Sequence, residues 1–338
     1  MQDYFRQMNA PDYLHTVSLT ELCDTVYQPK AQVVGGLLYS GAYLFAGAPK
    51  VGKSFFMAQL GYHESIGAPL WDYPTHSGTV LYLALEDNYA RLQKRLARMF
   101  GMEGTDSFHF ATRAKTLKEG LDDQLNKFMR GHPNTKLIII DTLQKIREVG
   151  GEQYTYASDY EIVTRLKQFA DQHNISVLLV HHTRKQGAAD CFNTISGTNG
   201  LLGAADGAFI MQNEKRTDNA ATLEIVGRDQ QDQRLHLLFD QERCIWELIQ
   251  VETALWVEPP DPLLEAVSKM VSPETPEWIG SASELVSFLN MSDIQPNVLT
   301  RRLNVGADRL WSDYGIRIDA SRNHAGRTVK LTLGRMEA

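Results

Sequence analysis

Short, nearly continuous apolar runs alternate with segments of helical spacing between residues 40 and 250. Runs of this kind are typical of strands in a parallel sheet that helices cover on both faces. Two later runs, 221–229 and 234–240, lie close together around a polar stretch and predict an antiparallel addition at the sheet edge. The pattern therefore predicts an α/β core whose mainly parallel strands are 42–47, 79–85, 108–112, 136–141, 176–182 and 207–212.

The sequence "VEPPDP" (257–262) ends this pattern, because its three prolines cannot continue a strand or a helix interior. Beyond it, the apolar spacing predicts three helices and a hairpin, which is the order of a winged helix-turn-helix; the segments are 262–271, 281–289, 295–315 and 316–333. The predicted organisation is an N-terminal arm or cap over 1–35, an α/β domain over 36–255 and a winged-helix domain over 262–335.

Composition excludes some classes of protein. The 338-residue chain has 43% hydrophobic residues and a formal net charge of −7, which is ordinary for a globular protein and argues against indiscriminate coating of nucleic acid. Its three widely spaced cysteines suggest neither a disulfide framework nor a zinc site. With no signal-peptide pattern and no long apolar run, we expect a cytoplasmic protein without a membrane partner.

One motif carries strong chemical information. Residues 47–54, "GAPKVGKS", fit GxxxxGK[ST] and lie between a predicted strand and a helix-like segment. In such a loop the backbone N–H groups face the phosphates, Lys53 reaches the β- and γ-phosphates and the Ser54 hydroxyl ligates Mg²⁺. We therefore expect ATP and Mg²⁺ as cofactors, held by Gly47, Ala48, Pro49, Lys50, Val51, Gly52, Lys53, Ser54 and Phe55.

Acidic residues follow two of the predicted strands. Asp141 ends the run "KLIIID", where open α/β sheets bind ligands and where a carboxylate can hold Mg²⁺ through water. Glu86 and Asp87 follow "TVLYLAL", and Glu86 is the candidate base that orients and polarises the attacking water. The alternative is that an acid here only caps the next helix, a role that we expect for Asp87.

Two adjacent histidines, His181 and His182, end the run "SVLLVHH". Successive strand residues face opposite ways, so only one of them can point toward the phosphates. A neutral imidazole there could report the γ-phosphate to a nearby loop, but the residues alone favour a structural histidine.

Taken in order, these strand ends resemble those of the RecA-like ATPases of the hexameric replicative helicase branch, above all the plasmid RepA-type helicases and similar mobile-element ATPases. The resemblance covers about residues 35–245 and rests on "GAPKVGKS", "LALEDNYARLQKRL", "LIIIDTL", "VLLVHHTRK" and "SGTNGLLGAADGAFIM". It implies that Asp141 is the Walker B residue, Glu86 the catalytic base and His182 the sensor. In this arrangement the base lies on a neighbouring strand and not beside Asp141, which Thr142 follows here.

The resemblance also implies a homo-oligomer, a hexamer, in which a basic finger from the neighbouring subunit completes each ATP site. Arg228 in "LEIVGRDQQDQRL" matches the position of this finger. The alternative is a surface arginine paired with Asp229. The catalytic set expected from the sequence is therefore Glu86, Lys53, His182 and Arg228.

Two regions are candidates for binding nucleic acid. The loop 183–200 follows the sensor strand, where RecA-like motors contact single-stranded DNA, and it offers Arg184 and Lys185 to phosphates. From Met291 to Arg335 there are eight basic residues against four acidic ones, in a chain that is acidic as a whole. This segment could bind duplex DNA or dock another replication protein; its candidate contacts are Arg301, Arg302 and Arg309 on the third helix and Arg322 and Arg327 on the wing.

The sequence thus favours an ATP-hydrolysing, ring-forming motor on single-stranded DNA, a replicative helicase of a plasmid or mobile element. One alternative is an ATP-switched DNA-binding or loading factor that does not unwind DNA. Another is a RecA-like recombination or signalling ATPase that acts on protein partners.

Overall fold

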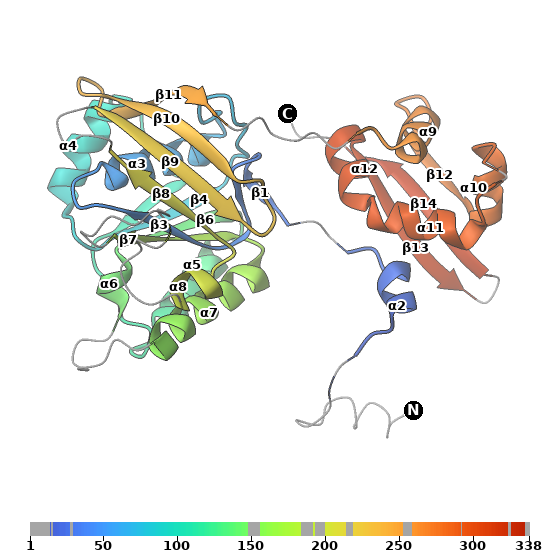
Figure 1. Ribbon diagram of the computed structural model, residues 1–338, viewed down its shortest axis with the longest axis horizontal. Coiled ribbons are helices and arrows are strands. Elements are labelled where there is room, and N and C mark those ends of the chain that lie inside the picture. Colours follow the sequence, from blue (N-terminus) through green and yellow to red (C-terminus); the bar gives the residue numbers. More distant parts are fainter. Residues whose placement is uncertain are drawn as a thin grey trace. The chain divides into compact units, whose positions relative to one another are not determined.

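The chain divides into two compact units, Lys30–Trp256 and a second unit that combines Met1–Pro29 with Val257–Ala338. The computed structural model (Figure 1) describes residues 14, 16–27, 30–147, 156–183, 192, 200–213, 219–252, 259–291, 293–323 and 326–334. The segment predicted as an arm or cap over 1–35 is thus divided between the units, since its described residues from Lys30 onward belong to the α/β unit.

A nine-stranded sheet forms the centre of the α/β unit in the described part of the chain, with the strand order β11-β10-β9-β8-β3-β7-β6-β4-β5. The strands from β8 to β5 in this order are parallel, and β9, β10 and β11 continue the sheet in antiparallel pairing. The predicted α/β core is confirmed; its strands are β3 (Gly41–Gly47), β4 (Thr79–Ala84), β5 (Phe108–Ala111), β6 (Thr135–Asp141), β7 (Ser176–His182), β8 (Gly207–Gln212), β9 (Ala220–Gly227), β10 (Gln233–Asp240) and β11 (Ile245–Val251).

Helices cover both faces of this sheet (Figure 1). Alternate residues of each apolar strand face opposite layers: in β3, Tyr43 and Phe45 pack with α3 and α4, whereas Leu44 and Ala46 pack with the helices of the other face. The helices are α3 (Lys53–Ile66), α4 (Tyr89–Phe100), α5 (Leu121–Gly131), α6 (Leu143–Ile146), α7 (Tyr156–His173) and α8 (Gly200–Ala204). A short β1–β2 hairpin (Gln32–Val34 and Leu38–Tyr39) precedes β3.

The cap of α4 differs from the prediction. Asn88, and not Asp87, is the N-cap residue, and its side chain accepts a hydrogen bond from the Arg91 amide at 3.0 Å. Asp87 lies one residue too early for this role. Its carboxylate instead pairs with Arg91 at 2.9 Å and with Arg95 at 2.8 Å, one and two turns into the helix.

The second unit has more elements than predicted. Its order is α9 (Pro262–Met270), β12 (Glu277–Ser281), α10 (Ala282–Phe288), α11 (Pro296–Val305), α12 (Ala307–Tyr314), β13 (Ile316–Asn323) and β14 (Gly326–Leu333). The sequence analysis did not predict β12, and the helix expected over 295–315 is interrupted at Gly306, whose backbone leaves the helical conformation. The expected hairpin is present as β13 and β14, and β12 pairs with β14 to complete a three-stranded sheet.

A short N-terminal helix, α2 (Leu19–Asp24), belongs to this second unit. Asp24 pairs with Arg301 of α11 at 2.9 Å, and Asn304 donates a hydrogen bond to the Cys23 carbonyl at 3.1 Å. The α2 helix therefore folds together with the last domain.

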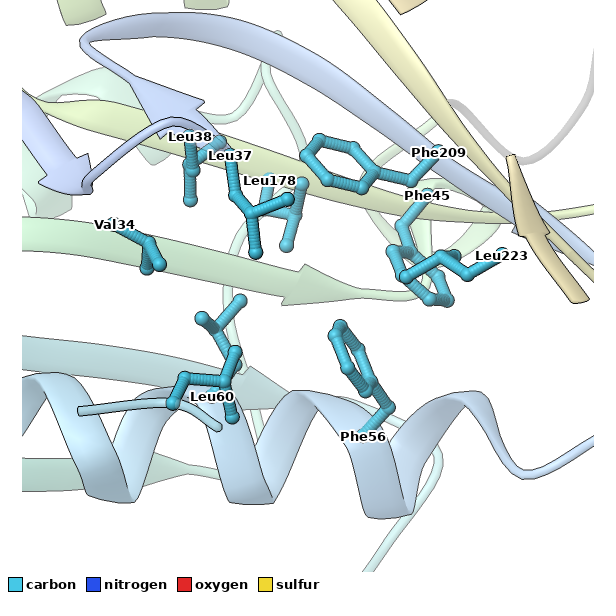
Figure 2. Close-up of a pocket in the computed structure, with 10 residues that line it drawn as sticks. Val34, Leu37, Leu38, Phe45, Phe56, Leu60, Leu178, Phe209 and Leu223 are labelled. Carbon is cyan, nitrogen blue, oxygen red and sulfur yellow. The ribbon is translucent and has the colours of Figure 1, made fainter. Parts of the chain in front are cut away.

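The largest apolar core of the α/β unit encloses a small void of about 10 Å³ (Figure 2). Leu60 and Phe56 point into it from α3, toward Phe45, Leu178 and Phe209 of the sheet. The lining is entirely hydrophobic and the volume is at the lower limit for one water molecule, so we interpret the void as a packing feature and not as a ligand site.

Leu60→Ala should enlarge this void and lower the free energy of unfolding by about 2–5 kcal/mol, because the rigid sheet opposite cannot collapse onto the smaller side chain. Leu238→Ala is the matched control, since Leu238 is 42% exposed and its truncation should cost about 0.5 kcal/mol or less. Urea denaturation measures both. Equal losses in the two variants would contradict the packing described here.

Glu64, in the last turn of α3, is completely buried. Burial raises the pKa of its carboxyl from 4.5 to about 8, an effect that the His76 amide and Lys136 only partly offset. The folded protein therefore holds this proton at pH values where the unfolded chain has lost it. The stability that the protonated form provides is complete below pH 4.5 and is lost as the pH rises toward 8.

Glu64→Gln should remove this pH dependence, because glutamine stays neutral. We expect wild-type stability to fall by more than about 2 kcal/mol between pH 5 and pH 8, and the variant to lose much less over the same range. Thermal denaturation at a series of pH values measures the difference. Glu161→Gln, at an exposed position on α7, should behave like wild type.

Candidate nucleotide-binding site

Four neighbouring parallel strands bring the candidate residues to one edge of the sheet. Gly47 at the end of β3 pairs with His182 at the end of β7, and Asp141 at the end of β6 pairs with Ala84 at the end of β4. The segments that follow these strands therefore lie side by side at the carboxyl edge, the usual location of ligand sites in open α/β sheets.

The loop from Gly47 to Gly52 has a conformation that depends on its glycines. A Cβ on Gly47 would lie 2.7 Å from the Met211 carbonyl oxygen, and Gly52 has φ of 102°. A side chain at either position would force the backbone to move. Ala48, Pro49 and Lys50 are exposed while Val51 is anchored in the core, and α3 begins directly after Gly52, so its positive amino end faces the loop.

Lys53, only 6% exposed, has its ammonium held inside this loop. Its Nζ donates to the carbonyls of Gly47 at 2.8 Å and Ala48 at 2.9 Å and lies 3.3 Å from His182 Nδ1. Burial lowers the pKa of Lys53 to about 8, against the opposing effect of Asp141 and Glu86. Burial and the Lys53 charge also lower the pKa of His182, which favours a neutral imidazole.

Ser54 and Asp141 place oxygen atoms together next to Lys53. The Ser54 hydroxyl donates to Asp141 Oδ2 at 2.7 Å, and the Tyr82 hydroxyl donates to the same oxygen at 2.8 Å. Mg²⁺ prefers hydroxyl and carboxylate oxygens, so the residues present fit a magnesium–nucleotide complex. Tyr82 is fully buried, and burial together with Asp141 raises its pKa well above the usual value, so it remains a donor.

Glu86 lies at the same edge. It is exposed, and its Oε1 accepts a hydrogen bond from the buried Thr142 hydroxyl at 3.3 Å. The Asp141–Thr142 peptide bond is cis. The structure thus brings together Lys53, Ser54, Glu86, Asp141 and His182, whereas His181 is buried in the sheet.

Sequence reasoning missed three residues of this site. Tyr82 and Thr142 are the partners of the two carboxylates, and the only signal for them was a hydroxyl beside or within an otherwise apolar strand. Trp246 comes from β11, which was not predicted. Its indole nitrogen lies 3.4 Å from the Gly52 carbonyl oxygen, and Gln59 of α3 forms two hydrogen bonds with its backbone, at 2.8 and 2.9 Å.

Phe55 connects the phosphate loop to the hairpin formed by β10 and β11. Its ring packs on Phe239 of β10, and the Arg95 guanidinium lies 5.0 Å from its centroid. Since Arg95 also pairs with Asp87, the first turn of α3 is linked to the segment that carries Glu86.

Arg228 is separate from these residues. It follows β9, whose last residue, Gly227, pairs with Gly207 at the start of β8. Because β8 runs parallel to β3, Arg228 lies at the amino edge of the sheet, opposite the phosphate loop. Its guanidinium donates to the Gly203 carbonyl at 3.1 Å.

Asp229, the alternative partner of Arg228, instead pairs with Lys30 at 2.9 Å. Lys30 also pairs with Asp206, a nearly buried carboxylate that accepts a hydrogen bond from the Ala42 amide at 3.0 Å. These ion pairs attach the start of the α/β unit to its sheet.

The candidate DNA-binding residues are only partly described. Arg184 and Lys185 lie outside the described residues, as does the side chain of Arg327, whose backbone forms the start of β14. The three arginines of the helices are engaged within their own unit: Arg301 with Asp24 at 2.9 Å, Arg302 with Asp261 at 3.3 Å, and Arg309 with Asp313 at 3.6 Å.

None of the helices in the described ranges is long and apolar enough to cross a membrane.

Known DNA repair proteins are similar to part of this chain. The DNA repair protein RadA of Streptococcus pneumoniae (strain ATCC BAA-255 / R6) is 24% identical over 183 residues, which are 54% of this chain and 38% of that protein. RadA of Rickettsia typhi (strain ATCC VR-144 / Wilmington) is 26% identical over 157 residues, which are 45% of this chain and 31% of that protein. The match thus spans about a third of the length of these relatives.

Solved structures agree on the fold. One solved ATPase domain superposes with a TM-score of 0.51 at 14% identity, over 62% of this chain and 85% of that one. A DnaB-like replicative helicase, solved in a study of its interactions with primase, gives a TM-score of 0.51 at 15% identity, over 61% and 58%. At these identities the likeness establishes the RecA-like ATPase fold and nothing more specific.

The family assignment comes from the sequence itself. The model of the AAA_25 family, described as an AAA domain, matches residues 10–188, more than half of the chain, and this range includes the phosphate loop, Glu86, Asp141 and His182. The protein therefore belongs to the AAA_25 family of AAA domains, and its α/β unit has the RecA-like ATPase fold.

Proposed function

We propose that this protein is an ATP-hydrolysing, ring-forming motor that acts on single-stranded DNA, a replicative helicase of a plasmid or mobile element. The observation that carries the ATPase part is the convergence of Lys53, Ser54, Asp141, Glu86 and His182 at one sheet edge. These are the groups needed to bind a triphosphate with its metal and to activate water.

Each residue has a role that follows from its contacts. The loop and Lys53 bind the β- and γ-phosphates, and Lys53 exchanges its contacts with Gly47, Ala48 and His182 for phosphate oxygens. Ser54 and Asp141 would hold Mg²⁺, which would neutralise charge on the phosphates. Glu86 accepts a proton from the attacking water.

His182 would report the nucleotide state. While Lys53 contacts His182, the imidazole is held at the phosphate loop. When Lys53 moves to phosphate, His182 can turn to the γ-phosphate and shift the loop 183–200, which directly follows it and carries Arg184 and Lys185. Hydrolysis would thereby alter the grip on DNA.

The position of Arg228 supports a composite site. Within one chain it lies at the edge opposite the phosphate loop, so it can reach a nucleotide only in a neighbouring copy. Head-to-tail packing of identical subunits presents one edge to the other and closes into a ring when the rotation allows. We propose a hexamer, with Arg228 as the finger of the adjacent site.

Action on DNA is supported by the names of similar proteins, one a DNA repair protein and another a replicative helicase. For the second unit we propose a winged helix, which the order α9, β12, α10, α11, α12, β13, β14 supports. Its arginines would exchange their ion pairs with Asp24, Asp261 and Asp313 for phosphates of duplex DNA, or for acidic groups of another replication protein.

The proposal is tested by steady-state ATPase rates with and without single-stranded DNA. We expect stimulation by DNA in the wild type and a rate lower by about 10³-fold in Lys53→Ala and in Arg228→Ala, since each removes charge that stabilises the transferring phosphoryl group. Arg130→Ala, an exposed arginine on α5, is the control and should match wild type.

Mixing the two inactive variants tests the composite site directly. In a mixed ring, an Arg228→Ala subunit supplies an intact phosphate loop and a Lys53→Ala neighbour an intact Arg228, so about a quarter of the sites regain both groups. Activity should therefore return on mixing. No recovery on mixing, or an Arg228→Ala protein as active as wild type, would overturn the motor with composite sites and favour the alternative of an ATP-switched DNA-binding or loading factor.

A further inference from the structure

Two hydroxyl groups connect β4 and β6 in opposite directions at the candidate site. Tyr82 of β4 donates to Asp141 at the end of β6, with a distance of 2.8 Å. Thr142, directly after β6, donates to Glu86, which follows β4, with a distance of 3.3 Å. The β4 segment thus supplies the Tyr82 hydroxyl and the Glu86 carboxylate, and the β6 segment supplies the Thr142 hydroxyl and the Asp141 carboxylate. Each hydroxyl donates to the carboxylate of the other segment.

The Tyr82 hydroxyl has a fixed position. The side chain is completely buried, and its ring packs against Phe108 and Phe110 of the next strand, with centroid distances of 6.5 and 5.9 Å. In the register of the sheet, Tyr82 pairs with Ile139, two residues before Asp141, so the length of the phenol carries its hydroxyl to the strand end.

Asp141 Oδ2 accepts two hydrogen bonds, one from Ser54 and one from Tyr82. A carboxylate held by two donors on one oxygen cannot rotate freely, so its other oxygen keeps a constant direction. Partners of this kind around a metal ligand orient it and affect metal affinity by about 10- to 100-fold. Glu86 differs from Asp141. Its carboxylate is exposed, and it accepts a hydrogen bond from the buried Thr142 hydroxyl.

We propose that Tyr82 and Thr142 are positioning residues with separate tasks. Tyr82 orients the Asp141 carboxylate for Mg²⁺, and Thr142 holds the Glu86 carboxylate in line for the attacking water. The proposal rests on the ATPase function proposed above. It predicts that loss of the Tyr82 hydroxyl affects metal affinity, whereas loss of the Thr142 hydroxyl affects the chemical step.

The first test measures metal binding without turnover. Mn²⁺ binding to the ADP complex, followed by electron paramagnetic resonance, should weaken by about tenfold in Tyr82→Phe, while ADP affinity in the presence of EDTA stays unchanged. Tyr62→Phe is the matched control. Tyr62 lies near the end of α3 that is far from the phosphate loop, where it stacks on Phe100 of α4, so its variant should bind Mn²⁺ like wild type.

The second test separates kcat from binding. Thr142→Val keeps the shape of threonine without the hydroxyl and should lower kcat by about tenfold or more, with unchanged Mn²⁺ affinity. Thr142→Ser restores the hydroxyl and should recover most of kcat. A role in folding alone would instead lower the melting temperature and change both readouts together.

The outcomes distinguish this proposal from the proposed function. If the wild type binds Mn²⁺·ADP and hydrolyses ATP but Tyr82→Phe binds the metal normally, the positioning role is overturned and the ATPase stands. The same holds if Thr142→Val keeps full kcat, or if Thr142→Ser is as slow as Thr142→Val. If the wild type shows no metal-dependent nucleotide binding, the proposed function itself fails.

Discussion

The register of four parallel strands is the constraint on which the candidate site depends. β3, β7, β6 and β4 are adjacent, and their last residues pair across the sheet, Gly47 with His182 and Asp141 with Ala84. A slip of one residue in any strand would turn its side chains to the opposite face. The apolar layers on both faces prevent such a slip, so the energy that stabilises the core also fixes the distances between Lys53, Ser54, Asp141 and Glu86.

The antiparallel end of the sheet supports the same site from outside. Trp246 of β11 packs on Gly52, whose hypothetical Cβ would lie 2.7 Å from the indole ring, and Gln59 connects the backbone of β11 to α3. On α4, Arg98 donates to the carbonyls of the β10–β11 turn. The phosphate loop is thus held between the sheet, α3 and a hairpin that occurs almost 200 residues later in the sequence.

The amino-acid sequence was informative wherever local chemistry decides structure. Continuous apolar runs gave the parallel strands, and the glycine spacing with Lys53 and Ser54 gave the phosphate loop. Prediction from the sequence failed where tertiary contacts decide the local structure. Asp87 and Asn88 are both good helix caps. The structure shows which one caps α4, because Asn88 accepts the Arg91 amide whereas Asp87 pairs with the side chains of Arg91 and Arg95. Tyr82 has the sequence pattern of a core residue, and its role became apparent only from the strand order, which brings Asp141 next to it. The association of α2 with α11 depends on residues nearly 280 positions apart.

We propose that the carboxyl edge of the sheet binds a nucleotide through Lys53 and a metal through Asp141. Isothermal titration calorimetry with ADP, in the presence and absence of Mg²⁺, measures both parts in wild type and in Asp141→Asn. From this proposal we expect Mg²⁺ to tighten ADP binding in the wild type and to have little effect in the variant, while the two proteins bind metal-free ADP equally. Absence of ADP binding by the wild type, or an undiminished effect of Mg²⁺ in Asp141→Asn, would contradict it.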